Sequence, residues 1–450
     1  MNEPATPRAS ADEPLLRVIL WLIVFLVAFF WMHESWYDAL VQKEGYYADF
    51  SQEWLSARNY WSSMPVYTPQ SEALLKHTGE RPVKDDAMLP WNVHPPASII
   101  FALPFGSLPN NKFAYRHSHL IWTAAMSACL LAALIVAIRV SGRNFQLGDA
   151  LMLGALLFFC SPLQTQLFQG QLNGIIAMLV VLAWAADKRE RYFQAGVLIG
   201  LAAAIKIVPA YLFLYWLVQR RWQALSGGVA GFVLLNCLAL AMFGLDSFRV
   251  YVEIVAPSVT NYRSSWDNVS ISGFWFKLFD PNEQVERVQA LARLPWLANG
   301  LSFLCQLIVT MIVSRRCVQA RTREQRDHAL GLAVIGMLLV SPITWSHYFL
   351  VLIMPLCVKS AVPYTTIGRW LFWGAVTVLW LPISWTTVPT MGTHIVKIWN
   401  VERGTHALIT PAQVLTGFAI QTYALTLLFA LYWYYFPQQA ICQRDYGIVE

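Results

Sequence analysis

The sequence predicts an all-α protein that crosses a membrane many times. Of its 450 residues, 57% are hydrophobic and only 13% are charged, whereas a soluble protein carries roughly 25% charged residues. Its apolar runs are long enough to cross about 30 Å of hydrocarbon as helices, at about 1.5 Å per residue. The Lys and Arg residues lie in short segments between these runs, so the net charge of +6 indicates membrane orientation. We therefore expect membrane lipids as partners and no nucleic acid.

The first apolar run, residues 15–32, leads into charged and aromatic residues without a small-residue cleavage site. This pattern predicts a permanent anchor and not a signal peptide. Residues 15–436 are expected to form a single transmembrane domain, between a disordered tail at 1–14 and a second tail at 437–450. About ten full spans are predicted, at residues 15–32, 117–139, 148–167, 172–187, 224–243, 295–314, 328–345, 347–361, 369–389 and 412–436.

The basic clusters all fall on one side of this map, the largest of them within residues 315–326. Calling that side cytoplasmic places both tails in the cytoplasm. The opposite side then receives the long loops 33–116, 244–294 and 390–411. Acids, Trp and Tyr in a large loop directly after the first span indicate a reaction chamber at the membrane surface, as in an enzyme that acts on a lipid-linked substrate.

Two segments do not fit as ordinary spans. Residues 195–219 are flanked by Arg191 and Arg220, so both ends of the segment are expected on the cytoplasmic side. Each arm is too short to cross, which predicts a helical hairpin broken at residues 206–209. The second segment, 95–108, is short and bracketed by prolines, and a re-entrant or broken helix is expected there.

The first long loop begins with a predicted amphipathic helix. Residues 47–61 carry an aromatic and apolar stripe at helical spacing, and we expect this helix to lie on the outer leaflet with the stripe toward the membrane. Asp49 and Glu53 lie off the stripe, one turn apart. They are either solvated surface acids or groups that face a cavity. Asp49 is the stronger functional candidate because it stands at the helix start in a crowded aromatic setting.

Lys206 is an ionisable residue inside an apolar segment. A charge inside a membrane costs at least about 2.5 to 3.5 kcal/mol, so such residues are usually functional. Pro209 favours the first turn of the returning half-helix, whose N-terminal end adds to the positive potential near the ammonium. The sequence thus predicts an anion site here. The alternative is a lysine that snorkels or pairs with a carbonyl.

Polar residues at predicted external turns are further candidates. Gln171 and Asn173 suit sugar hydroxyls, or else cap helices. His94 and His347 are suited to phosphate or substrate contacts, or else to backbone hydrogen bonds. Asn268, in the second long loop, carries a weaker signal. The predicted substrate-binding residues are Glu53, His94, Gln171, Asn173, Asn268 and Trp345.

No cofactor and no metal are predicted. The chain has no Walker loop, no Rossmann glycine fingerprint, no His-Glu-x-x-His and no Asp-x-Asp motif. The absence of Asp-x-Asp argues against a soluble-type nucleotide-sugar enzyme. The seven cysteines include no Cys-x-x-Cys pair, so disulfides and cysteine metal sites are not expected.

Six motifs in order give the chain a family resemblance. It resembles the integral-membrane glycosyltransferases of the GT-C type, and more narrowly glycosyltransferase family 87 (DUF2029), which includes polyprenol-phosphate-mannose-dependent mannosyltransferases. The match covers most of the chain and does not specify sugar or acceptor. Its motifs are the Asp49-Phe50 helix ending at Pro65-Val66-Tyr67, Pro95-Pro96, Gly170-Gln171-x-Asn173, Ala195-Gly196 with Lys206-x-x-Pro209, Asn268-x-Ser270, and Ser341-Pro342 with Trp345-x-His347.

The resemblance implies roles for individual residues. It implies that Asp49 is the catalytic base and that His347 lies near the lipid phosphate, where Lys206 is a second candidate. His94 stands where the family more usually has an aromatic residue, which leaves its role open. The implied localisation is a bacterial inner membrane, with the active site on the extracytoplasmic side.

The sequence thus predicts a GT-C-like glycosyltransferase that moves a hexose, with mannose implied by the family, from a polyprenyl-phosphate donor to an extracytoplasmic glycan or glycolipid. A phosphate leaving group needs no protonating acid, so one base suffices, and in-line attack inverts the anomeric centre. The alternatives are a lipid-linked sugar flippase or transporter, and a surface-polysaccharide polymerase or ligase. The absence of an internal repeat and the one-sided loops argue against the transporter.

Overall fold

A computed structural model describes residues 12–41, 47–81, 90–107, 114–142, 146–282, 288–381 and 409–437. These ranges are built from helices, and their one β feature is an isolated bridge between Val288 and Ile409. The predicted all-α class is therefore confirmed. Most of the predicted loop 390–411 and most of both predicted tails lie outside the described residues.

Most of the helices form the central part of the molecule, which we call the central belt. They are α1 (Asp12–Leu40), α6 (Ala114–Ser141), α7 (Leu147–Phe158), α8 (Ser161–Gln169), α9 (Asn173–Lys188), α10 (Tyr192–Ile205), η2 (Val208–Leu212), α11 (Phe213–Val218), α12 (Trp222–Val250), α15 (Pro295–Gln319), α16 (Arg323–Val340), η5 (Ser346–Leu352), α17 (Ile353–Cys357), α18 (Thr366–Trp380), α20 (Pro411–Gln413), η6 (Val414–Phe418) and α21 (Ile420–Tyr434).

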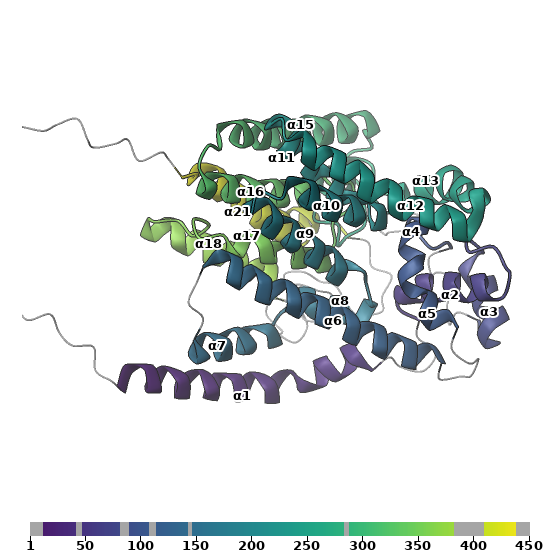
Figure 1. The fold of residues 1–450 in the computed structure, drawn as a ribbon, viewed down its shortest axis with the longest axis horizontal. Coiled ribbons are helices and arrows are strands. Elements are labelled where there is room, and N and C mark those ends of the chain that lie inside the picture. The colour runs from purple at the N-terminus through teal and green to yellow at the C-terminus, as the bar shows by residue number, and fades with distance from the viewer. Residues whose placement is uncertain are drawn as a thin grey trace, which may run out of the picture.

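Shorter helices form a compact end to this belt, at the right of Figure 1. Part of the predicted loop 244–294 is helical, because α12 continues past Gly244. Helix α12 bends at Gly244, which has a φ of 76° and a ψ of 169°. Residues 96–106 form one short apolar helix with a 3-10 turn in its middle, and a re-entrant position in the membrane stays a prediction. The elements are α2 (Phe50–Trp61), α3 (Gln70–Thr78), α4 (Pro96–Ile99), η1 (Ile100–Ala102), α5 (Leu103–Gly106), η3 (Tyr251–Val255), α13 (Ala256–Ser258), η4 (Val259–Tyr262) and α14 (Ile271–Phe279).

Fewer helices than predicted have the length of a full span. In the described residues, four helices are long and apolar enough to cross a membrane, or up to six if each bent pair counts as one span. One bent pair is α7 with α8, at 61°, within the predicted span 148–167. Residues 347–361 hold two short pieces, η5 and α17. The predicted count of about ten full spans is thus not confirmed, because several apolar runs are interrupted helices.

The hairpin at residues 195–219 has the predicted break. The backbone leaves α10 in an extended conformation at Lys206, with φ −150° and ψ 123°. The chain then returns through η2 and α11 to the end at which α10 began. This return is seen in the contact between Arg221, before α12, and Tyr192, at the start of α10: the guanidinium lies 4.4 Å from the ring centroid. Helix α10 packs along α12 so closely that a Cβ on Gly196 would lie 1.8 Å from the carbonyl oxygen of Ala224.

The predicted helix 47–61 exists as α2, but the prediction that its apolar stripe faces the membrane is wrong. Phe50 and Trp54 are 0% and 1% exposed, and Phe50 stacks on Trp122 of α6 at 4.9 Å. The stripe therefore packs against protein. A helical stripe of apolar residues reports an apolar neighbour without distinguishing lipid from protein.

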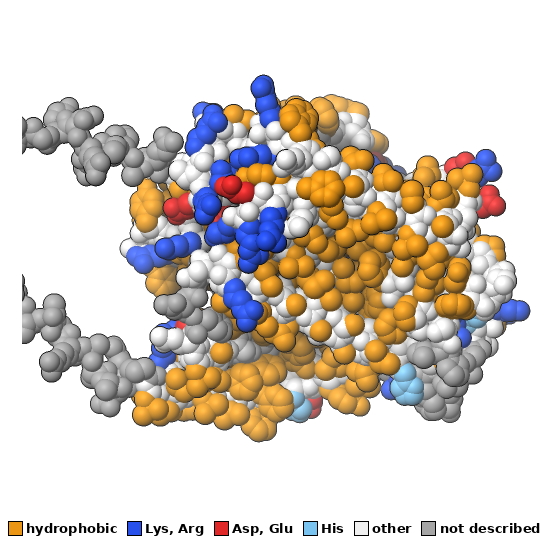
Figure 2. Space-filling model, viewed as in Figure 1, with side chains coloured by type: hydrophobic (Ala, Val, Ile, Leu, Met, Phe, Trp, Pro, Cys, Tyr) orange, Lys and Arg blue, Asp and Glu red, His pale blue; other side chains and the backbone are white. Residues whose placement is uncertain are grey.

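The two ends of the molecule differ in charge. Figure 2 shows most of the visible Lys and Arg at the end where α16 and α18 begin and α21 ends in Figure 1, with an apolar surface over the middle. Arg316 of the basic run donates to the carbonyl of Trp433, 2.8 Å away, near the end of α21. Helices α2 to α5 lie at the opposite end.

Candidate active site

The start of α2 holds Asp49 in place through backbone contacts. The Asp49 amide donates to Oε1 of Gln169 at 3.3 Å, and the preceding amide, of Ala48, donates to the Tyr115 hydroxyl at 2.9 Å. Gly170 ends α8 with φ 64°, where a Cβ would lie 2.7 Å from Cβ of Phe50. This glycine therefore allows the α8–α9 turn to approach the start of α2 closely.

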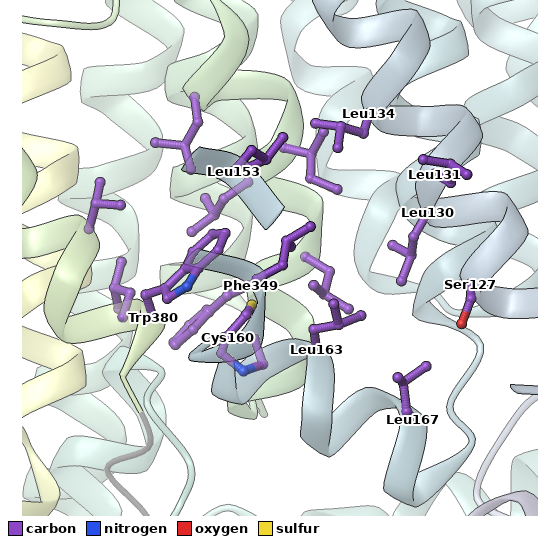
Figure 3. A pocket seen from close by; sticks show the side chains of 18 of the residues that line it. Ser127, Leu130, Leu131, Leu134, Leu153, Cys160, Leu163, Leu167, Phe349 and Trp380 are labelled. Atoms are coloured by element: carbon purple, nitrogen blue, oxygen red, sulfur yellow. The ribbon is translucent and has the colours of Figure 1, made fainter. Parts of the chain in front are cut away.

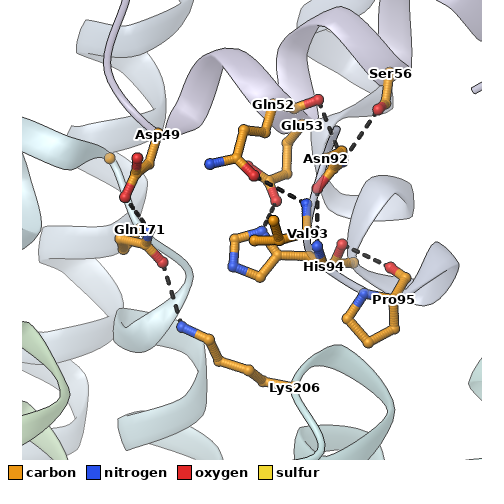
Figure 4. Close-up of polar contacts among 12 residues, drawn as sticks. Asp49, Gln52, Glu53, Ser56, Asn92, Val93, His94, Pro95, Gln171 and Lys206 are labelled. Atoms are coloured by element: carbon orange, nitrogen blue, oxygen red, sulfur yellow. Dashed lines mark hydrogen bonds and ion pairs between the residues drawn. The ribbon is translucent and has the colours of Figure 1, made fainter. Parts of the chain in front are cut away.

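One amide connects Asp49 to Lys206. Gln171 Nε2 donates to Oδ2 of Asp49 at 2.6 Å, and Lys206 Nζ donates to Oε1 of the same glutamine at 3.3 Å (Figure 4). The Lys206 ammonium also donates to Oδ1 of Asn173 at 3.4 Å. Asp49 and Lys206 are half-buried. The structure thus brings together a carboxylate from α2, amides from the α8–α9 turn and an ammonium from the hairpin break.

An aromatic residue and a histidine complete the surroundings of Lys206. Its Nζ lies 4.0 Å from the ring centroid of Tyr348, a cation–π contact. The adjacent His347 is 4% exposed, and its Nε2 is buried without a hydrogen-bond partner in the described part of the chain. A buried ring nitrogen without a partner is costly unless a ligand satisfies it.

Glu53 and His94 form a buried pair on the other side of this cluster. Nδ1 of His94 contacts Oε1 of Glu53, and their side chains are 5% and 3% exposed. Asn92 Nδ2 donates to the Gln52 carbonyl at 3.2 Å and so holds the His94 loop on α2. In Figure 4 this pair and the Asp49–Gln171 pair face each other, with Lys206 reaching toward Gln171. Glu53 is therefore not a solvated surface acid.

The electrostatics at Asp49 come from opposing effects. Burial raises the pKa of its carboxyl above the ordinary value, because the charged form loses hydration. The hydrogen bond from Gln171 and the charges of His94 and Lys206 lower that pKa, while the charge of Glu53 raises it. A carboxylate with a raised pKa is a stronger base than an ordinary aspartate, which suits proton abstraction.

The remaining predicted residues lie in adjoining positions. Trp345 lies beside His347, with ring centroids 5.7 Å apart. Asn268 is 0% exposed, and its Oδ1 accepts from the amide of Thr344 at 3.0 Å while its Nδ2 donates to the carbonyl of Pro342 at 3.0 Å. In this structure Asn268 braces the turn that carries Trp345 and His347. Its predicted contact with substrate stays a prediction.

Two residues that contribute to the candidate site, Tyr348 and Gln52, were not predicted from the sequence. Tyr348 follows His347 directly, but only the fold shows its ring under the Lys206 ammonium. Gln52 accepts from the amide of Val93 at 3.0 Å and helps to fix the His94 loop. In the described ranges, no three His, Cys, Asp or Glu side chains gather where they could hold a metal ion.

An apolar groove adjoins these residues. It has a volume of about 290 Å³ and runs between α6, α7, α8, η5, α17 and α18. Phe349 of its wall follows Tyr348, and Leu167 of its wall precedes the Gly170 turn (Figure 3). Most of the other lining residues are leucines, among them Leu130, Leu131, Leu134, Leu153, Leu157 and Leu163. Asp49, Gln171, Asn173, Lys206 and His347 are called the polar cluster below. The groove thus shares two elements, α8 and η5, with the polar cluster.

The fold thus combines membrane-length apolar helices with acid, amide, lysine and histidine side chains that converge at one end. The comparison with known families identifies the class of protein to which it belongs. Residues 92–342, more than half of the chain, match the profile of glycosyltransferase family 87. The chain belongs to this family and is a membrane glycosyltransferase, as the motifs predicted.

Characterised relatives are similar over most of their length. One, a polyprenol-phosphate-mannose-dependent alpha-(1-2)-phosphatidylinositol mannoside mannosyltransferase of Mycolicibacterium smegmatis, is 24% identical over 414 residues, 88% of this chain and 87% of the relative. A phosphatidylinositol pentamannoside mannosyltransferase of the same organism, dependent on the same donor, is 25% identical over 71% of this chain and 72% of its own length. No solved structure matches the chain.

Proposed function

We propose that the protein transfers mannose from a polyprenyl-phosphate carrier to a hydroxyl of a glycolipid or glycan on the extracytoplasmic side, with Asp49 as the base. The observation that carries this proposal is the bridge through Gln171, which joins the Asp49 carboxylate to the Lys206 ammonium at 2.6 and 3.3 Å. The site thus holds a base for the acceptor proton and a cation for the departing phosphate, which are the two groups that displacement of a phosphate from a sugar carbon requires.

The proposed reaction balances with these groups. The acceptor oxygen forms a bond to the anomeric carbon while the bond from that carbon to the phosphate oxygen breaks. The acceptor proton goes to Asp49, whose burial makes it a stronger base. The departing phosphate keeps the bonding electrons as negative charge, which Lys206 and a donor from His347 stabilise. Attack from the face opposite the phosphate inverts the anomeric centre.

The donor assignment has two supports. The relatives named above depend on polyprenol-phosphate-mannose, and the apolar groove adjoins the polar cluster through α8 and η5. We assign the groove to the isoprenoid chain, because an apolar chain gains about 25 cal/mol for each Å² that it buries. In this assignment the phosphate lies by Lys206 and His347.

The acceptor and the sidedness follow from separate observations. The relatives act on phosphatidylinositol mannosides, and a glycolipid of that kind reaches a site at the membrane surface by lateral diffusion. Asn173, Trp345 and the Glu53–His94 pair are the groups that we assign to sugar hydroxyls and ring faces. The end rich in Lys and Arg faces the cytoplasm under the positive-inside rule, which leaves Asp49 on the other side.

A donor assay with the purified protein tests this function. The full chain in lipid nanodiscs receives a phosphatidylinositol mannoside and either radiolabelled polyprenyl-phosphate mannose or a radiolabelled nucleotide-diphosphate mannose. We expect label in the glycolipid only with the lipid donor, with one polyprenyl phosphate released for each mannose transferred. Direct use of the nucleotide sugar contradicts the donor assignment. Movement of the intact lipid donor between leaflets, without release, identifies a flippase instead.

A further inference from the structure

A second cavity lies at the basic end, on elements whose other ends form the polar cluster. It has a volume of about 330 Å³ and lies between α6, α9 and α10. One part of its lining is apolar and the other carries hydrogen-bond donors. The apolar residues are Val136, Val140, Leu182, Ala185, Ala186 and Leu198, and the donors are Arg139, Arg189, Arg191 and Gln194.

The three arginines of this cavity lack an acidic partner among the residues that the structure describes. Arg139, Arg189 and Arg191 are exposed, and none of them makes an ion pair or a side-chain hydrogen bond with another described residue. Three positive charges thus surround one cavity without a counter-ion in the part of the chain that the structure describes. Like charges gathered in this way repel one another unless an anion lies between them.

Neighbouring cations differ in this respect. Lys188 forms an ion pair with Asp327 at 3.0 Å and donates to the carbonyl of Val140 at 2.9 Å. Arg326 lies 3.9 Å from the carboxylate of Glu190. Glu190 stands between Arg189 and Arg191 in the sequence, yet its carboxylate is directed to α16. Asp327 and Glu190 therefore pair with cations outside the cavity.

We propose that this cavity binds the phosphate headgroup of an anionic phospholipid from the leaflet at the basic end of the molecule. Guanidinium groups bind phosphate oxygens through paired, charge-assisted hydrogen bonds. Leu182, Leu198 and the two valines give an apolar wall against which an acyl chain packs, and a basic pocket between membrane helices is a known form of lipid site. Orientation by the positive-inside rule needs arginines at this end, but it needs no cavity with an apolar wall.

The apolar wall also distinguishes a lipid from a free phosphate. A soluble anion uses only the arginines, whereas a phospholipid uses both parts of the lining. Figure 2 shows Lys and Arg side chains at the border of the apolar surface, which is where lipid headgroups meet a membrane protein. Because α10 begins at this cavity and ends beside Lys206, the lipid stabilises the helix that positions the ammonium.

Thermal unfolding of the full chain in mild detergent tests the proposal. The probes are phosphatidylglycerol, phosphatidylcholine with the same acyl chains, and soluble glycerol 3-phosphate. We expect phosphatidylglycerol alone to raise the Tm in a saturable way, because a ligand that binds only the folded state stabilises it. Equal effects of the two lipids remove the headgroup assignment. An equal effect of glycerol 3-phosphate shows a free-phosphate site and overturns the lipid assignment.

Variants locate the effect. In R189Q/R191Q, the phosphatidylglycerol concentration at half-maximal stabilisation is expected to rise roughly tenfold or more, because a hydrogen bond to a charged group contributes about 1.5 to 3 kcal/mol. R369Q is the matched control, since Arg369 is exposed at the start of α18, outside the cavity. If the double variant unfolds, native mass spectrometry of R189Q alone replaces it, with fewer retained phosphatidylglycerol molecules than R369Q expected. Equal retention or an unchanged midpoint contradicts the proposal.

Discussion

Asp49 and Lys206 are the two residues whose charges the sequence already marked as unusual. An acid at a helix start in an aromatic setting and a lysine inside an apolar segment were both identified without a structure. Their connection was not, because Gln171 was one of several amides near a turn and its two contacts depend on the fold. The pairing of Glu53 with His94 was likewise hidden, since sequence distance says nothing about which polar groups meet in a buried region.

The Gln171 contact predicts a shift in the pH dependence of transfer. Asp49 acts as a base only when deprotonated, so kcat/KM falls as the pH drops through its pKa. Gln171 stabilises the carboxylate and lowers that pKa. In Q171A the pKa rises further, and the acid limb of the kcat/KM profile is expected to move to higher pH.

The control for this shift is Q223A, because Gln223 is exposed on α12, away from the cluster. Its acid limb is expected to coincide with that of the wild type. An acid limb of Q171A that stays in place or moves to lower pH is inconsistent with Asp49 as the titrating base.

The helices show where sequence patterns suffice and where they do not. The break at Lys206 was predicted because basic residues flank a segment too short to cross twice. The partner of the α2 stripe was predicted wrongly, since an apolar stripe fits lipid and protein equally well. The span count is not confirmed, and hydropathy does not register interruptions such as the 61° bend between α7 and α8, which lies within one predicted span.

The α10–α12 contact gives a prediction at this scale. A Cβ on Gly196 would lie 1.8 Å from the Ala224 carbonyl oxygen, so the helices must separate in G196A. We expect a loss of about 1 to 3 kcal/mol of stability, the usual cost of overpacking, seen as a lower Tm in detergent.

G374A serves as the comparison, because a Cβ on Gly374 of α18 has no atom within 4 Å. Alanine in an open helix interior is more stable than glycine by about 0.5 to 1 kcal/mol, so its Tm is expected to stay or rise. A Tm of G196A equal to that of the wild type rules out the close packing of these helices.

The whole molecule separates charge along its long axis. Lys and Arg gather at one end, apolar side chains cover the middle, and α2, which Asp49 precedes, lies at the other end. This separation was predicted from the order of basic and apolar segments, because each span reverses the direction of the chain. The close approach of α2, the α8–α9 turn, the hairpin and η5 was not predicted, because it depends on packing between distant segments.

Sidedness is the prediction for the whole molecule. Ser63 follows α2, and Arg321 lies in the basic run; both are exposed. In a cysteine-free background, a membrane-impermeant maleimide applied to intact cells or spheroplasts is expected to label S63C and not R321C. After lysis both are expected to react. Labelling of R321C alone in intact cells places the Asp49 end in the cytoplasm and contradicts an extracytoplasmic site.

The central claim is that the Asp49 carboxylate accepts the acceptor proton, and D49N tests it most directly. Asparagine keeps the shape of the side chain but removes the base, so initial rates with polyprenyl-phosphate mannose are expected to fall roughly 10²- to 10⁴-fold. E72Q, at an exposed acid of α3, is expected to keep the wild-type rate, and both variants should show the wild-type elution profile. A folded D49N that transfers mannose as fast as E72Q would contradict the account.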